Sequence, residues 1–226
     1  MAALVNSTGF SSILEITEDT YTINQTDSQT NTTPIPSPTK KIKIKEEVAI
    51  VEPNVHSLNR KWILWSHLPQ NPDWTIKSYN KICSLNTLED VVAVLNIIPD
   101  ILVTNCMLFL MRDGITPMWE DVKNKDGGCF KYRIINKHVP QTWKHLIYTL
   151  VGETLSSNKL FLQNVNGITI SPKKKFCILK VWTSNCDFQN SDVIDIDNAI
   201  LKTNKALFEI HDTALNKDLN SSNDTL

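Results

Sequence analysis

Residues 113–128 have the sequence D-G-I-T-P-M-W-E-D-V-K-N-K-D-G-G, which places a tryptophan beside a carboxylate, Trp119 and Glu120. Turn-forming residues enclose this pair, with Asp113-Gly114 before it and Asp126-Gly127-Gly128 after it. Because such sequences favour tight turns, we expect the pair to lie in a surface loop rather than in the core. A rigid aromatic face beside an acceptor-only carboxylate suits a flat ligand that stacks and donates hydrogen bonds from one edge, as a guanine base does.

The segments on either side predict that this loop joins two strands. Residues 107–112 are mostly apolar, and residues 129–136 alternate apolar side chains with Lys131 and Arg133, the pattern of a half-buried strand. Loops between strands are a usual position for binding residues, because the sheet holds them on a rigid scaffold.

The rest of the folded region predicts more strands than helices. Asn166-Gly167 is a strong hairpin signal, and Asn86 or Thr87, followed by acidic residues, can cap a helix that Pro99 ends. This pattern is typical of an α+β fold with an antiparallel sheet and helices packed on one face. The further strands are expected at residues 60–65, 76–85 (or an irregular connection), 160–165, 167–171, 176–182 and 206–210, and the helices at residues 86–98, 140–153 and 194–201.

The length of 226 residues allows one domain of ordinary size with tails. Residues 1–52 are rich in Ser, Thr, Asn and Gln and poor in large apolar side chains, so they predict a disordered tail. Residues 53–215 would form the domain and residues 216–226 a flexible C-terminal tail. No apolar run approaches the roughly eighteen residues of a membrane span, and the N-terminus does not predict a secretory signal.

Five cysteines, an odd number, occur without any C-x-x-C spacing. This argues against a disulfide framework or a zinc site and favours a reducing compartment, the cytoplasm with the nucleus as an alternative or additional location. We expect no metal and no other cofactor. The run K-K-I-K-I-K-E-E at residues 40–47 leaves three interpretations open. It is a nuclear-import patch, a lysine-modification site at residues 44–47, or a solvated run of charges.

The net charge of −1 is unevenly distributed along the chain. Residues 56–182 contain 16 Lys and Arg against 9 Asp and Glu, whereas both flanks are acidic. The middle of the chain is therefore expected to attract a polyanion.

The string G-I-T-P-M-W-E-D-x-x-N-K-x-G-G at residues 114–128 resembles the translation initiation factor 4E family, whose members bind the cap of messenger RNA. Tryptophans spaced around the string and H-x-L at residues 56–58 add to the resemblance, which covers roughly residues 56–182 and continues more faintly to about residue 217. It implies a curved antiparallel sheet with helices on the convex face and the cap site on the concave side. Trp62 and Trp65 match residues that are largely structural in the family, so we assign both to the core.

The resemblance also implies a cap site made of two indoles and one acid. Trp74 and Trp119 match the tryptophans that sandwich the methylated base, whose positive charge adds a cation–π attraction to stacking. Glu120 matches the carboxylate that accepts the N1 and N2 protons of guanine and disfavours adenine, which presents an acceptor at N1. Trp182 matches the residue that closes around the methyl group, although from the residues alone it is equally a core side chain.

Lysines are expected to hold the triphosphate of the cap. Lys173 falls on the family's phosphate-binding arginine, a change that keeps the charge but loses the bidentate geometry. The second family lysine falls on Ile178, which departs from the pattern, so Lys175 or Lys180 is expected to take its place. Lys217 weakly resembles a further lysine near the phosphates.

Family members use the opposite, helical face to bind a helical peptide of a scaffold protein, initiation factor 4G, or of competing repressors. Three matching positions are retained or conservatively changed, His56, Leu88 and Gly152. The central tryptophan of that surface is Val92 here, and the residues Lys144, His145 and Tyr148 replace an apolar, an acidic and an apolar residue. Loss of a buried aromatic anchor commonly costs about 2 kcal/mol or more, so we expect scaffold or repressor binding to be weakened or altered.

Three classes of function follow from these patterns. The preferred one is binding of the 7-methylguanosine cap, either in translation initiation or as a repressor. An enzyme is disfavoured because the sequence has no glycine-rich phosphate loop, no metal-binding carboxylate cluster and no nucleophile with a neighbouring base. An interaction module that lost cap binding is opposed by the intact Trp74, Trp119 and Glu120, whereas Ile178 leaves room for it.

Overall fold

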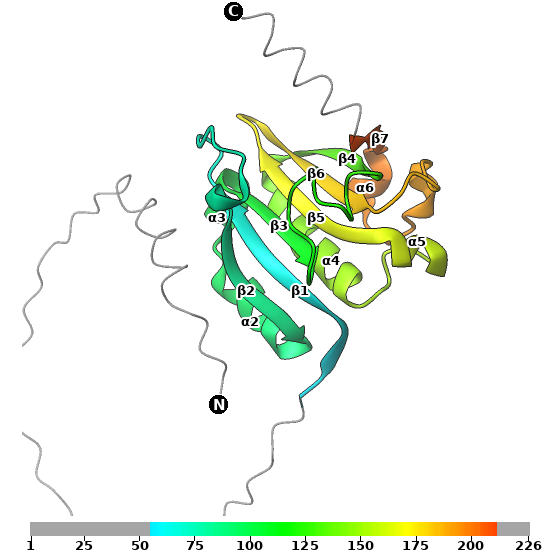
Figure 1. Ribbon diagram of the computed structural model, residues 1–226, viewed down its shortest axis with the longest axis horizontal. Helices are drawn as coiled ribbons and strands as arrows, with labels where there is room; N and C mark the ends of the chain where they lie inside the picture. The colour runs from blue at the N-terminus through cyan, green and yellow to red at the C-terminus, as the bar shows by residue number, and fades with distance from the viewer. Residues whose placement is uncertain (1–54, 212–226) are drawn as a thin grey trace, which may run out of the picture.

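The computed structural model describes residues 55–211, which form a curved, seven-stranded sheet with the strand order β2-β1-β3-β5-β6-β4-β7 (Figure 1). Neighbouring strands are all antiparallel, as the sequence predicted. The strands are β1 (Ser57–His67), β2 (Asn80–Thr87), β3 (Met107–Arg112), β4 (Gly128–Ile135), β5 (Val165–Pro172), β6 (Phe176–Thr183) and β7 (Leu207–Ile210).

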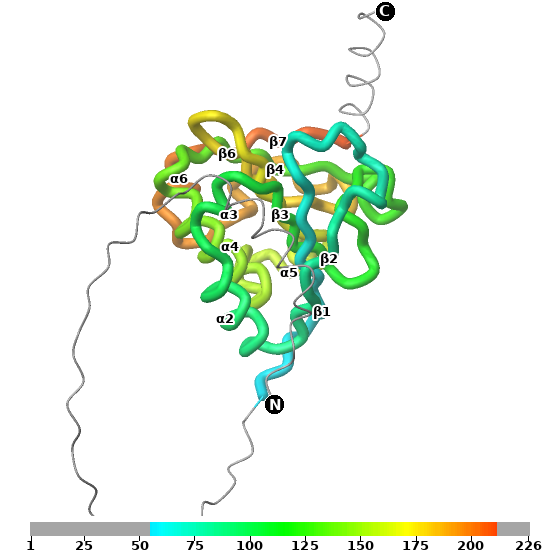
Figure 2. Tube along the Cα trace, turned by 90° about the vertical axis from the view of Figure 1, so that its left-hand side faces the viewer, coloured from blue at the N-terminus to red at the C-terminus, as the bar shows by residue number. Residues whose placement is uncertain are grey.

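The α-helices of the described range pack on one side of this sheet, and the loops that follow β1 and β3 lie on the other (Figure 2). We call the two sides the helix face and the open face. The helices are α2 (Leu88–Ile97), α3 (Asp100–Asn105), α4 (Val139–Val151), α5 (Lys159–Asn164) and α6 (Ala199–Thr203), and the short 3-10 turns are η1 (Ile76–Ser78), η2 (Asn136–His138) and η3 (Ser191–Val193). Each of these α-helices contributes buried side chains to the main core.

Alternation along the strands separates two hydrophobic clusters. On β6, Leu179 and Val181 enter the main core on the helix face, whereas Lys180 and Trp182 point to the open face. Trp62 is fully buried in the main core, as predicted, and Trp143 of α4 is buried there too. Trp65 is only partly buried and packs in the second cluster on the open face, so its assignment to the core is corrected to that side.

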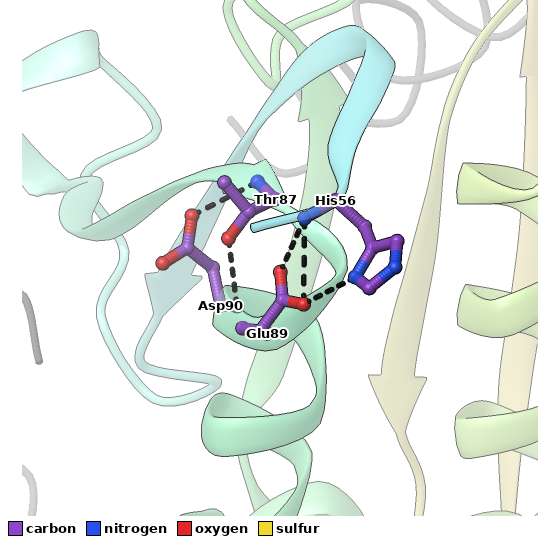
Figure 3. Close-up of polar contacts among 4 residues, drawn as sticks. All are labelled: His56, Thr87, Glu89 and Asp90. Atoms are coloured by element: carbon purple, nitrogen blue, oxygen red, sulfur yellow. Dashed lines mark hydrogen bonds and ion pairs between the residues drawn. The ribbon is translucent and has the colours of Figure 1, made fainter. Parts of the chain in front are cut away.

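Helix α2 begins where the sequence predicted, at a reciprocal capping box. The Thr87 hydroxyl accepts a hydrogen bond from the Asp90 amide at 3.1 Å, and the Asp90 carboxylate accepts one from the Thr87 amide at 3.0 Å (Figure 3). These bonds satisfy amides that a helix N-terminus otherwise leaves free. The chain that enters β1 is tied to the same turn, because the His56 ring and amide contact the Glu89 carboxylate at 2.7 and 3.1 Å.

The expected hairpin at Asn166-Gly167 is wrong. Residues 160–164 belong to α5, whose N-terminus is capped by the Asn158 side chain, and Asn166-Gly167 lies within β5. The glycine is required by close strand packing, because a Cβ atom at Gly167 would lie 2.4 Å from the Leu110 carbonyl oxygen. The Asn166 amide is buried and donates to the Lys123 carbonyl oxygen at 2.6 Å, so it anchors a neighbouring loop instead of forming a turn.

The helix expected at residues 194–201 is also misplaced. That segment contains an irregular connection, and α6 begins at residue 199 after Asn198, whose side chain accepts hydrogen bonds from two amides of the first turn. The segment at 76–85 starts as η1 and continues as β2, which matches both alternatives in part.

The predicted tails, the charged run at residues 40–47 and Lys217 lie outside the described residues. Between residues 55 and 211, every helix is too short or too polar to span a bilayer.

Candidate functional site

The loop between β3 and β4 is held in place by its own polar side chains. Asp121 accepts hydrogen bonds from the Thr116 amide and hydroxyl at 2.7 and 2.6 Å and from the Lys123 amide at 2.8 Å. Partial burial opposes the charge of Asp121, but these hydrogen bonds outweigh it and lower the pKa of the carboxyl group. The fully buried Asn124 donates to the carbonyl oxygens of Thr116 and Met118 at 3.0 and 2.8 Å. Residues 119 and 120 are therefore carried on a folded scaffold.

The turn into this loop has the geometry that its sequence predicted. Gly114 has a φ of +75°, in the left-handed region that favours glycine. The Asp113 amide donates to the Lys61 carbonyl oxygen at 2.9 Å, which attaches the start of the loop to β1.

Trp119 lies half-buried on the second cluster of the open face. The buried members of that cluster are Phe109, Met111, Ile115 and Trp182. Trp182 is 2% exposed, and its indole N–H donates to the Thr169 hydroxyl at 2.8 Å. Trp182 is therefore a core residue of the cluster against which Trp119 packs, and its contact with a ligand stays a prediction.

Two cationic or ionisable groups lie next to the Trp119 ring. The Lys180 Nζ atom is 5.0 Å from the ring centroid, and the His211 ring is nearly parallel to it at 6.2 Å. Burial lowers the pKa of the Lys180 ammonium group and also that of the His211 imidazole, since both would carry charge out of water. The His211 Nδ1 atom donates to the Asn124 carbonyl oxygen at 2.7 Å, while its Nε2 atom is buried without a partner.

Trp74 lies on a second loop, which follows β1. The Asn71 carboxamide accepts from the Asp73 amide at 3.0 Å, and the Asp73 carboxylate accepts from the Thr75 amide at 2.8 Å, an interaction that lowers the pKa of Asp73. These bonds fix the backbone on both sides of Trp74. The indole is 51% exposed, and it stacks on the ring of His67 with a centroid separation of 4.3 Å and an interplanar angle of 9°.

Tyr79 connects the two loops. Its ring contacts His67 at 4.8 Å and Phe109 at 5.4 Å, and it belongs to the same cluster as Trp119. Burial, followed by the negative charge of Glu120, raises the pKa of the Tyr79 hydroxyl to about 12. Glu120 itself is exposed. Trp119 and Glu120 of one loop and Trp74 of another are thus brought to one region of the open face.

The predicted phosphate-binding lysines occupy two different places. Lys173 and Lys175 are exposed on the turn between β5 and β6, and Lys180 lies on the open face beside Trp119. Sequence reasoning missed two further cations of the same face. Lys131 is the β4 partner of Lys180 and is also paired with Glu209 at 2.8 Å, and Arg133 is the β4 partner of Ile178. The alternation of β4 was visible in the sequence, but its register against β6 was not.

The residues predicted for protein binding lie on the helix face. Leu88, Val92 and Tyr148 are each about two-fifths exposed, at 42%, 39% and 42%. The remaining four are His56 beside Glu89, the partly buried Lys144 and His145, and the exposed Gly152 at the C-terminus of α4. Sheet and core separate these residues from the second cluster on the open face (Figure 2).

Comparisons with known proteins agree with this architecture. The sequence profile of the family described as "Eukaryotic initiation factor 4E" matches residues 57–225. The chain is 27% identical over 168 residues to eukaryotic translation initiation factor 4E of Bos taurus, covering 70% of this chain and 76% of that protein. It is 33% identical over 141 residues to factor 4E-1 of Schizosaccharomyces pombe, covering 58% and 62%.

Solved structures give the same fold. The complex of C. elegans eIF4E-3 with the 4E-binding protein Mextli and a cap analog aligns with a TM-score of 0.60 at 21% identity, covering 72% of this chain and 96% of that chain. The complex of Ascaris suum eIF4E-3 with the m2,2,7G cap aligns with a TM-score of 0.59 at 22% identity, covering 70% and 92%.

Proposed function

Because the chain belongs to the eukaryotic initiation factor 4E family, we propose that it binds the 7-methylguanosine cap of messenger RNA and acts in translation initiation or its regulation. Members of this family are cap-binding factors and not enzymes. The observation that carries the proposal is the meeting of Trp74, Trp119 and Glu120 on the open face, linked through His67, Tyr79 and the second cluster.

In the proposed complex the base stacks between Trp74 and Trp119. The positive charge that N7-methylation leaves on the ring adds a cation–π attraction to each indole face, and stacking is worth about 1–3 kcal/mol per aromatic contact. Exposure of Trp74 supports this role, since about half of the residue's surface is accessible to a ligand. Trp182 supports Trp119 from below and offers little free surface of its own to the methyl group.

Glu120 gives the proposed site its base selectivity. Its carboxylate accepts only, so it pairs with the N1 and N2 protons of guanine and repels the N1 acceptor of adenine. The phosphates then lie toward the cations of β6 and β4. Lys180 and Lys131 are cross-strand partners on the open face, Arg133 follows two residues along β4, and Lys173 and Lys175 add charge at the turn.

A 7-methyl-GTP resin tests the proposal. The full chain should be retained, and free 7-methyl-GTP should elute it at concentrations at which GTP does not. Trp119→Ala should abolish retention, and Leu160→Ala, a change of an exposed side chain of α5, should not. Equal elution by both nucleotides, or retention of Trp119→Ala, would contradict cap binding through this site.

A regulatory role is the second candidate, because the helix face departs from the family pattern at its centre. Val92 replaces the central tryptophan, and Lys144 and His145 change the charge around it. We propose that this face still takes a helical peptide of a 4G-like scaffold or of a 4E-binding protein, with lower or altered affinity. Pull-down with scaffold-derived and repressor-derived peptides distinguishes a translation factor from a cap-binding repressor. We place the proposed activity in the cytoplasm.

A further inference from the structure

The indole of Trp74 stands against a buried histidine that the cap-binding motif does not include. The His67 side chain is 0% exposed and comes from the last residue of β1. Its ring is nearly parallel to that of Trp74, at 9° and 4.3 Å, so the two rings make face-to-face contact over their planes. The backbone of His67 pairs with Met107 of β3, which fixes the histidine in the sheet.

The same histidine also holds the loop that carries Trp74. The His67 Nε2 atom lies 2.9 Å from the carbonyl oxygen of Asp73, and since a carbonyl only accepts, this nitrogen carries the hydrogen. One side chain therefore anchors the backbone immediately before the tryptophan and supports one face of its indole. Trp74 as a residue is still 51% exposed, so the stacked contact with His67 leaves surface that a ligand can use.

We propose that His67 is a positioning residue for Trp74. It holds the indole, before the ligand arrives, in the orientation and position that the cap-binding site needs. This inference rests on the proposed function. An exposed tryptophan on an unsupported loop would sample several rotamers, and ordering it would cost binding free energy. A ring fixed in the sheet removes that cost, and Tyr79, which packs at 4.8 Å on His67, supports the histidine in turn.

Three substitutions separate the two contacts. His67→Phe keeps an aromatic face and loses the hydrogen bond to Asp73, His67→Gln keeps a donor and loses the ring, and His67→Ala loses both. If stacking positions the indole, His67→Ala and His67→Gln should weaken 7-methyl-GTP binding about three- to tenfold, the range expected for one stacked aromatic pair. His67→Phe should stay within about twofold of the wild type.

A spectroscopic measurement without ligand tests positioning directly. In protein labelled with 5-fluorotryptophan, the 19F resonance of Trp74 is assigned by its loss in Trp74→Phe. In His67→Ala and His67→Gln this resonance should move toward the position of a solvent-exposed indole, whereas in His67→Phe it should remain dispersed. An unchanged resonance of the buried Trp143 shows that each variant is folded. Leu160→Ala, which truncates an exposed side chain of α5 outside both proposed surfaces, should change neither measurement.

The outcomes distinguish this inference from the proposed function. A Trp74 resonance that is unaffected by His67→Ala would overturn the positioning role, whatever the ligand affinity. A wild-type protein that fails to bind 7-methyl-GTP would refute the proposed function, while the 19F shifts would still decide whether His67 positions Trp74.

Discussion

Glu120 carries the base selectivity of the proposed site with one exposed carboxylate. In Glu120→Gln, one carboxylate oxygen becomes an amide nitrogen, which donates and cannot pair with the donating N1 or N2 group of guanine. One hydrogen bond is therefore lost, and the remaining one is made by a neutral oxygen instead of a charged one. Hydrogen bonds to charged groups contribute about 1.5–3 kcal/mol, and we therefore expect 7-methyl-GTP to bind at least about tenfold more weakly. Quenching of tryptophan fluorescence during titration measures the change. Glu89→Gln, the same substitution on the helix face, is the matched control and should bind normally.

The buried imidazole of His211 makes stability depend on pH. Burial lowers its pKa, so between pH 6.5 and the depressed value the unfolded chain binds a proton that the folded chain does not. Stability contributed by the neutral ring is complete above pH 6.5 and is lost as the pH falls below it. We expect the melting temperature to fall between pH 7.5 and pH 5.5, and to fall less in His211→Phe. If the melting temperatures of the wild type and His211→Phe fell equally over this pH range, His211 would not be the source of the pH dependence.

Site residues that lie in one contiguous string could be predicted from the sequence, whereas contacts that the sheet brings together could not. Trp119 and Glu120 are adjacent in the motif, so their common loop could be predicted from turn signals. His67 lies behind Trp74 and His211 behind Trp119 because of strand and loop packing, which no local pattern records. Their roles in binding remain predictions, to be tested as described above.

Helix α2 depends on its cap more than on its intrinsic helix propensity, because three of its ten residues are valines. Thr87→Ala removes the hydroxyl that accepts from the Asp90 amide, and loss of such a cap costs about 0.5–2 kcal/mol. We expect the free energy of unfolding, measured in urea, to fall by about 1 kcal/mol with an unchanged slope. Thr104→Ala is the control, since that hydroxyl donates to carbonyl oxygens of its own helix and accepts from the adjacent Asn105 side chain, but caps no helix N-terminus. If both variants lost the same free energy of unfolding, the Thr87 cap would have no special role in α2.

The wrong hairpin at Asn166-Gly167 shows where a local pattern fails. The dipeptide favours a tight turn, but here the glycine permits close approach of β5 to β3, and the asparagine anchors the neighbouring loop. The glycine contacts Leu110 and the asparagine contacts Lys123, each about 40 or more positions away in the sequence. A pattern of two adjacent residues therefore could not indicate either contact. By contrast, α4 was predicted correctly because its apolar stripe is long and periodic.

Gly167→Ala tests the strand placement. The added Cβ atom would lie 2.4 Å from the Leu110 carbonyl oxygen and 2.5 Å from the Met111 Sδ atom, and the first neighbour is backbone that cannot move cheaply. Overpacking of this kind costs about 1–3 kcal/mol, and we expect that loss in urea unfolding. A change below about 0.5 kcal/mol would instead fit an open turn at this position.

The molecule as a whole places two candidate binding surfaces on opposite faces of one sheet (Figure 2). Cap contacts are proposed on the open face, and peptide contacts on Leu88, Val92 and Tyr148 of the helix face. Because the main core lies between them and no proposed contact residue belongs to both surfaces, substitutions on one face should leave the other unaffected. Effects at separate, non-contacting sites are expected to add.

Val92→Trp tests this separation together with the reason for weakened scaffold binding. Val92 is 39% exposed and lies four residues after Leu88 on α2, so a tryptophan there extends an existing apolar surface. A buried aromatic anchor contributes about 2 kcal/mol or more, so affinity for a 4G-derived helical peptide should rise at least about tenfold. Fluorescence anisotropy of the labelled peptide measures it.

Leu160→Trp, which adds the same indole to an exposed position of α5, is the matched control and should not raise peptide affinity. If Val92→Trp also leaves 7-methyl-GTP binding unchanged, the missing anchor and not the cap site limits recruitment of the scaffold. An unchanged peptide affinity would mean that Lys144 and His145 have altered the specificity of the surface, because replacing an apolar and an acidic residue there would then disfavour the peptide even with the anchor restored.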